Sequence, residues 1–127
     1  MTSENSKSLV TGTEEDGAFT LTILVDQIRD PMTSTALRNE MINLVDPISP
    51  KCVIVNFEKV QFMGSIGFLA LMALRRHLTD SRMVLCGLSQ SLKDVFELCG
   101  LVANDANEEV KFEVAENEQA ARQAFLS

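Results

Sequence analysis

One hydroxyl group stands out in the sequence, that of Ser65 in the short turn Gly64–Gly67. Before this turn lies a β-branched run, Val53–Val55, that is typical of a buried strand, and after it a helical pattern extends to about Leu78. The first turn of a helix has backbone N–H groups without intrahelical partners and carries the positive end of the helix dipole. A phosphate group on the Ser65 hydroxyl would be stabilised there. Ser65 is therefore a candidate either for modification or for capping the helix.

Capping is the simpler interpretation of Ser65, because serine is a preferred N-cap residue whose replacement by Ala costs about 1 kcal/mol. On spacing alone, this structural role is favoured over phosphorylation. A nucleophilic role is disfavoured, since the hydrolase pattern G-x-S-x-G has Met63 in place of its first glycine. The single histidine, His77, lies roughly 18 Å away along the same predicted helix, too far to act as a base. We therefore predict that the protein is not an enzyme.

Composition limits the partners that this chain is expected to bind. At 127 residues and 46% hydrophobic content it fits one domain with its own core. The net charge of −7 argues against binding to nucleic acid or to an anionic membrane. Residues 1–15 are polar and acidic, and no run reaches the ~18 apolar residues of a membrane helix. We expect a cytoplasmic protein with a flexible terminus at residues 1–7 and one domain at 8–127.

The cysteines give no sign of a metal site or a disulfide framework. Cys52, Cys86 and Cys99 are odd in number, lack C-x-x-C spacing and lie beside hydrophobic residues of predicted strands or helices. Buried free thiols in a reducing compartment are the expected state. With one histidine in the chain, we predict neither a metal nor another cofactor.

Strand and helix patterns alternate along the chain. The predicted elements are strands at 8–13 and 19–25, a helix from Pro31 that ends before Pro47, a strand at 52–57, a helix at 65–78, a strand at 82–86, a helix ending at Gly100, a strand at 110–114 and a helix at 116–126. Such alternation implies right-handed crossovers and a mixed or mostly parallel sheet.

Local signals define several of these elements further. Asp16-Gly17 indicates a hairpin between the first two strands, and Asp30 is a predicted N-cap with proline at the next position. Either Ser89 or Ser91 is suited to cap the third helix. The face of strand 19–25 that carries two threonines and a leucine is less polar than an exposed sheet face requires, so we expect it to be partly covered.

Two apolar residues flank the Ser65 turn. Met63 precedes it and Phe68 follows it, and together they are candidates for an exposed apolar rim that contacts a partner. Core packing is the alternative for both residues, and it is the commoner use of such side chains.

The residues around Ser65 resemble a STAS domain of the bacterial anti-sigma factor antagonist type. In that family a strand leads into the motif F-[MI]-D-S-[ST]-G-L-G, which is followed by a helix. The segment Phe62–Leu69 matches the motif at Phe62, Met63, Ser65 and Gly67.

A second motif makes the resemblance more specific. The family pattern G-L-S-x-x-(L/V)-x-x-(V/L)-(F/L)-E-L-(T/C)-G-L is closely matched by Gly87–Leu101, and the resemblance covers residues 8–126. The chain departs from the family at Gly64, where relatives carry an acidic residue, and at Ile66, where they carry a second hydroxyl.

The resemblance implies a fold and a mechanism. The implied fold is α/β, a mixed, mostly parallel sheet of about four to five strands with helices packed on one side. The implied function is a partner switch in transcription regulation. The unmodified protein binds an anti-sigma factor that is also a serine kinase, and this frees the sigma factor. The kinase then uses ATP to phosphorylate Ser65, which breaks the complex, and a serine phosphatase reverses the modification.

The resemblance also implies a set of contact residues. The predicted partner-binding residues are Asp30, Thr33, Met63, Gly64, Ser65, Ile66, Gly67, Phe68 and Ser89. The departures at Gly64 and Ile66 favour one alternative, a non-phosphorylated STAS scaffold or a subunit of a signalling assembly.

Overall fold

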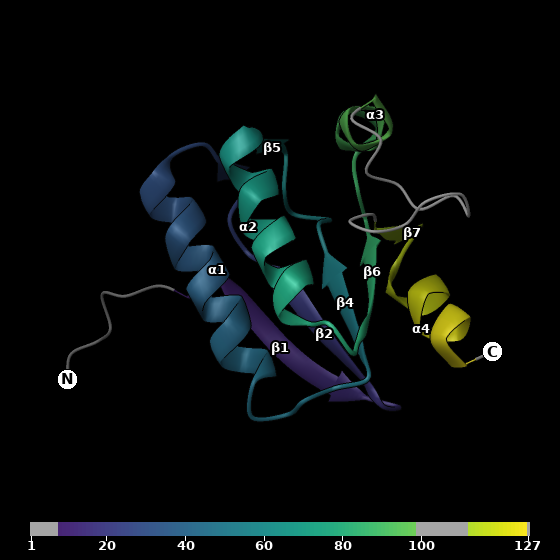
Figure 1. The fold of residues 1–127 in the computed structure, drawn as a ribbon. Helices are drawn as coiled ribbons and strands as arrows, with labels where there is room; N and C mark the ends of the chain where they lie inside the picture. The colour runs from purple at the N-terminus through teal and green to yellow at the C-terminus, as the bar shows by residue number, and fades with distance from the viewer. Residues whose placement is uncertain (1–7, 99–111, 127) are drawn as a thin grey trace.

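A five-stranded sheet in the order β1-β2-β4-β6-β7 forms the centre of the molecule (Figure 1). The structure is a computed structural model that describes residues 8–98 and 112–126. The elements are β1 (Val10–Glu15), β2 (Ala18–Ile23), β3 (Gln27–Ile28), α1 (Pro31–Val45), β4 (Cys52–Asn56), β5 (Phe62–Met63), α2 (Ser65–His77), β6 (Arg82–Cys86), α3 (Gln90–Leu98), β7 (Glu113–Ala115) and α4 (Glu118–Leu126).

The sheet is mixed and mostly parallel, as the sequence predicts. Strands β1 and β2 form an antiparallel hairpin, whereas β4, β6 and β7 run parallel to their neighbours. The hairpin turn consists of Asp16 and Gly17 with φ angles of 57° and 83°, the left-handed conformation that the Asp-Gly pair favours. The predicted hairpin is therefore confirmed.

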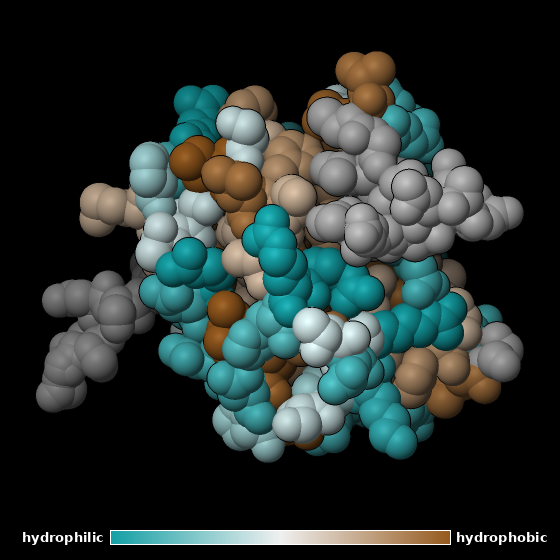
Figure 2. All heavy atoms as spheres, viewed as in Figure 1, coloured by the Kyte–Doolittle hydropathy of each residue, from teal (hydrophilic) through white to brown (hydrophobic). Residues whose placement is uncertain are grey.

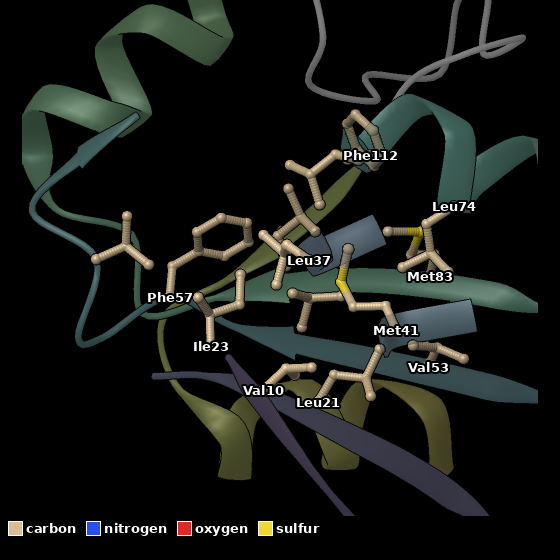
Figure 3. Packing of buried hydrophobic residues seen from close by; sticks show 14 of the residues in the cluster. Val10, Leu21, Ile23, Leu37, Met41, Val53, Phe57, Leu74, Met83 and Phe112 are labelled. Carbon is tan, nitrogen blue, oxygen red and sulfur yellow. The ribbon is translucent and has the colours of Figure 1, made fainter. Parts of the chain in front are cut away.

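The main core lies between one face of the sheet and the helices α1 and α2, with α3 closing one end. Alternate residues of each strand point to this face, because successive side chains of a strand point to opposite sides. Figure 3 shows side chains from strands and helices converging there, among them Val10, Leu21, Ile23, Leu37, Met41, Val53, Phe57, Leu74, Met83 and Phe112.

The prediction that all helices pack on one side of the sheet is wrong, because α4 covers the opposite face. Ala121 of α4 is fully buried there, and Phe125 packs beside it. The central parallel strands are apolar on both faces, which demands cover on both sides. The strand residues buried under α4 are Ala18, Cys52, Ile54, Val84 and Cys86. The expected partial cover of the second face of β2 is confirmed, with Thr20 only 5% exposed.

A short parallel pair outside the main sheet was not predicted. Strands β3 and β5 pair Gln27 with Phe62 and Ile28 with Met63, in segments outside the strands that hydrophobic periodicity predicted. A further hydrogen bond of 2.9 Å runs from the Gly64 N–H to the Ile28 carbonyl oxygen. This pair joins the segment that precedes α1 to the segment that precedes α2, so the two helix starts lie side by side.

Two of the three thiols are buried and free, as predicted. Cys52 and Cys86 are both fully buried. Burial raises the pKa of the Cys86 thiol to about 12, with Glu118 and Glu58 adding to the effect. Cys99 and the predicted helix end at Gly100 lie outside the described residues.

Within residues 8–98 and 112–126, no helix combines the length and the apolar character that crossing a membrane requires. In the same residues, no group of three or more His, Cys, Asp or Glu side chains is arranged to hold a metal ion.

Candidate functional site

Ser65 is exposed and is the first residue of α2. The N-cap is Gly64, which is extended with φ −83° and ψ −179°, so the prediction that Ser65 caps the helix is wrong. The reason is the bond between Gly64 and Ile28, which keeps Gly64 in the strand-like segment and places Ser65 inside the helix. Within the part of the chain that the structure describes, the Ser65 hydroxyl makes no hydrogen bond. It faces solvent at the positive end of the helix.

The two glycines of the turn have different roles. A Cβ atom on Gly67 would overlap the Met63 side chain and approach Ile28 Cγ2 to 3.1 Å, so α2 can sit this close to β5 only with glycine at this position. A Cβ atom on Gly64 would meet nothing closer than 3.8 Å. Close packing therefore explains Gly67, but neither packing nor backbone conformation requires glycine at position 64.

Helix α1 begins beside this turn with the predicted cap. The Asp30 carboxylate accepts hydrogen bonds from the Thr33 N–H at 3.0 Å and from the Thr33 hydroxyl at 2.7 Å. Pro31 occupies the first helical position. Hydrogen bonds from Thr33 lower the pKa of the Asp30 carboxyl below its usual value. Asp30 and Thr33, which the family resemblance assigns to the partner-binding residues, therefore form the N-terminal cap of α1.

A cleft of about 160 Å³ separates the starts of α1 and α2. The buried Ser34 hydroxyl, in the lining of the cleft, donates a hydrogen bond of 2.8 Å to the Ile66 carbonyl oxygen and so links the two helices. The cleft is lined by Pro31, Ser34, Thr35, Arg38, Ile66, Leu69 and Ala70.

The exposed apolar residues near Ser65 differ from those predicted. Met63 is only 6% exposed, so its place in an exposed rim is wrong, and Phe68 is half-buried with its ring 4.8 Å from that of Phe96. The apolar residues that do reach solvent are Met32 (82% exposed), Phe62 (45%) and Leu69 (61%).

Simple periodicity identifies these exposed residues once the elements are known. Leu69 follows Ser65 by four residues and so shares its helix face, and Phe62 points away from the core because its neighbour Met63 points into it. We call Met32, Phe62, Ser65, Leu69 and the cleft residues the Ser65 surface. Figure 2 shows hydrophobic residues gathered over the N-terminal halves of α1 and α2, whereas hydrophilic residues dominate over their C-terminal halves.

Two arginines border the Ser65 surface. The Arg29 guanidinium lies over the Phe62 ring, 5.0 Å from its centroid, and Arg38 lines the cleft with hydrogen bonds to Asn39. Neither arginine forms an ion pair with a carboxylate of residues 8–98 or 112–126. The surface is therefore apolar at its centre, and its edge carries two arginines without carboxylate partners among the described residues, together with the exposed carboxylate of Asp30.

Ser89 lies at the start of α3, whereas the other predicted partner-binding residues belong to the segments around the starts of α1 and α2. It is exposed at the start of α3, where its hydroxyl accepts a hydrogen bond of 3.2 Å from the Leu92 N–H. This hydrogen bond identifies Ser89, and not Ser91, as the residue that caps α3. Among the described residues, no hydrogen bond connects Ser89 to the Ser65 surface.

Comparison with known proteins assigns the chain to a family. The STAS domain model matches residues 11–120, so the chain belongs to the STAS domain family. No curated protein sequence gives a significant match.

Solved structures support this fold. An anti-sigma factor antagonist from Mycobacterium paratuberculosis superimposes with a TM-score of 0.75 at 20% identity, covering 100% of both chains. A STAS domain protein from Planctomyces limnophilus, titled an anti-sigma-factor antagonist, gives 0.75 at 18% identity over 94% of this chain and 98% of that one. The Bacillus cell fate determinant SpoIIAA in its phosphorylated form gives 0.61 at 19% identity over 91% of this chain and 98% of that one.

Proposed function

We propose that this protein is an anti-sigma factor antagonist that binds an anti-sigma factor/serine kinase through the Ser65 surface. Phosphorylation of Ser65 by the kinase controls the complex, and a serine phosphatase restores binding. The observation that carries the proposal is the Ser65 hydroxyl, which is exposed, free of intramolecular hydrogen bonds among the described residues, and adjacent to exposed apolar side chains. A kinase can reach such a hydroxyl without unfolding the domain.

Phosphorylation at this position would break a complex without breaking the fold. A phosphate adds a charge of roughly −1.5 to −2 at neutral pH. The start of α2 tolerates that charge because unpaired N–H groups and the helix dipole face it. A partner that covers Phe62 and Leu69 would have to bury the same charge in an apolar contact, which is strongly unfavourable. The modification therefore acts on the interface.

Similarity to solved structures supports this proposal at the level of the fold. The matching Mycobacterium paratuberculosis and Planctomyces limnophilus proteins are titled anti-sigma factor antagonists, and the matching Bacillus protein was solved in a phosphorylated form. A domain of this fold thus accepts phosphorylation.

The test is to incubate the protein with ATP and the serine kinase that co-purifies with it, and to locate phosphate by mass spectrometry. We expect a single phosphate on Ser65, none on a Ser65→Ala variant, and normal modification of a Ser91→Ala control, which removes another exposed hydroxyl at a helix start. Phosphate on a different residue, or none at all, would contradict the proposal.

A non-phosphorylated scaffold, or a subunit of a signalling assembly, remains the second candidate. Gly64 favours it, because the N-cap of α2 lacks the carboxylate that the family motif places next to the acceptor. Pull-down of the co-purifying partner with Ser65→Ala and Ser65→Asp discriminates the two functions. Equal capture by both variants supports the scaffold, and capture by Ser65→Ala alone supports the switch.

A further inference from the structure

The cleft between α1 and α2 has the size of a side-chain pocket. Its volume of about 160 Å³ is well below the ~300–1,000 Å³ of typical small-molecule sites. Leu69, Ile66 and Ala70 supply its apolar wall, and a well-exposed Met32 extends the apolar area along α1. This shape fits one aliphatic side chain from another protein better than it fits a ligand or cofactor.

The charged residue in the lining of the cleft, Arg38, has the opposite sign to the net charge of the whole protein. The chain carries a net charge of −7. In α1 and α2, however, the only carboxylate belongs to Glu40, and it accepts a hydrogen bond from the Leu9 N–H. Asp30, just before α1, accepts two hydrogen bonds from Thr33 and is exposed with its negative charge intact. The residues that line the cleft carry one charge, that of Arg38, and the guanidinium of Arg29 lies nearby over the Phe62 ring.

Arg29 is held in place by a weak interaction. Its contact with the Phe62 ring is a cation–π interaction, which at an exposed site contributes only about 0.5–1 kcal/mol. A carboxylate offers a guanidinium two parallel hydrogen bonds and is the better partner. Within residues 8–98 and 112–126, Arg29 therefore has no carboxylate partner, and Arg38 hydrogen-bonds to the neutral amide of Asn39 alone.

We propose that the partner segment that docks on the Ser65 surface is an amphipathic, acidic helix. One of its aliphatic side chains enters the cleft, and carboxylates on either side of that chain bind Arg29 and Arg38. The inference rests on the proposed function for the location of the interface, and it adds the chemistry of the segment that binds there.

This partner chemistry also explains how a phosphate on Ser65 would act. The Gly64 N–H is bonded to the Ile28 carbonyl, so Arg29 is the next residue along the strand that borders the Ser65 turn. A phosphate would compete with the partner's carboxylates for Arg29, and it would repel them directly. An acidic partner is thus more sensitive to phosphorylation than a neutral one.

The experiment uses two synthetic helical peptides with the same leucine-bearing face, one flanked by Glu and the other by Lys. Each is titrated into the ¹⁵N-labelled full chain while amide chemical shifts are followed. We expect the Glu peptide to bind at least about fivefold more tightly than the Lys peptide and to shift the amides of Thr35 and Leu69. Non-specific attraction to a protein of charge −7 would give the opposite preference.

Arginine variants locate the charge contacts. The double variant Arg29→Ala/Arg38→Ala is expected to remove the preference for Glu, whereas Arg76→Ala, at the far end of α2, retains it. Equal or tighter binding of the Lys peptide, shifts that map away from the cleft, or no binding of the Glu peptide would each overturn the inference. The peptide titration involves neither a kinase nor ATP, so a failure here is distinct from a failure of Ser65 to be phosphorylated.

Discussion

The Gly64 N–H and the Ile28 carbonyl oxygen form a hydrogen bond of 2.9 Å that joins the two segments leading into α1 and α2. This bond continues the parallel pairing of β3 and β5 by one step. It fixes Gly64 as the last non-helical residue before α2, so the proposed phosphate acceptor, Ser65, is the first residue of the helix. Small changes at the glycines of this turn should therefore have measurable effects.

Gly67→Ala is expected to destabilise the protein by about 1 kcal/mol, although alanine is intrinsically the better helix former by a similar amount. The new methyl group would overlap the Met63 side chain and crowd Ile28, and overpacking of this kind typically costs about 1–3 kcal/mol. Urea unfolding measures the change. The double variant Gly67→Ala/Met63→Ala should be less destabilised than the sum of the two single variants, because the clash is gone. Strict additivity would show that this contact does not limit position 67.

Gly64→Asp is expected to stabilise the protein by roughly 0.5 kcal/mol. The extended backbone of Gly64 suits an N-cap residue, and a Cβ atom there has room. The carboxylate would accept a hydrogen bond from an unpaired N–H of the first turn and would also restore the acidic residue of the family motif. The free energy of unfolding from urea titration tests this. Gly64→Ala, which adds a Cβ atom without a cap, is the control, and a gain of the same size in that variant would contradict the capping argument.

The sequence predicted those features whose signals are local. Asp16-Gly17 specified a hairpin, Asp30 and Pro31 specified a helix start, and both are present. Hydrophobic periodicity located the main strands and helices. The second motif, together with the first, was enough to identify the family, which the match over residues 11–120 confirms.

The features that were missed depend on contacts between distant segments. Strands β3 and β5 have two residues each, too few to show any periodicity. Because of their pairing, Phe62 points outward and Met63 inward, and the N-cap of α2 is Gly64, whereas the sequence favoured Ser65. The face of the sheet that receives α4 is likewise set by chain crossover and packing, which the pattern of α4 alone does not reveal.

The thiols of Cys52 and Cys86 should be unreactive in the folded protein. Burial raises the pKa of both thiols, that of Cys86 to about 12, and so disfavours the reactive thiolate form of each. In a Cys99→Ser variant, mass spectrometry after iodoacetamide treatment should detect no alkylation of native protein and two alkylated residues in urea. Rapid alkylation of native protein would contradict the buried environment.

The same pKa shift gives a pH dependence of stability. The pKa of Cys86 is higher in the folded state than in the unfolded state. The protonated thiol therefore makes its full contribution to the free energy of unfolding below the unfolded pKa of about 9. We expect that contribution to be lost as the pH rises from 9 towards 12. Urea unfolding at pH 7 and pH 10 measures the change. Between these two pH values, the free energy of unfolding of a Cys86→Ala variant should fall by less than that of the parent chain.

Ser65→Asp should separate the stability of the domain from its binding. A carboxylate in the first turn of α2 interacts favourably with the helix dipole, by about 0.3–1 kcal/mol at an exposed site. The Tm of Ser65→Asp should therefore equal or exceed that of the parent chain. Its affinity for the co-purifying partner should nevertheless fall at least about tenfold, because the charge would lie within the apolar contact with Phe62 and Leu69. Differential scanning calorimetry and isothermal titration calorimetry on the same samples measure both quantities, with Ser65→Asn as the uncharged control. Loss of binding that coincides with a lowered Tm would mean that charge at position 65 acts by unfolding the start of α2, and the phosphate would then control the fold and not the interface.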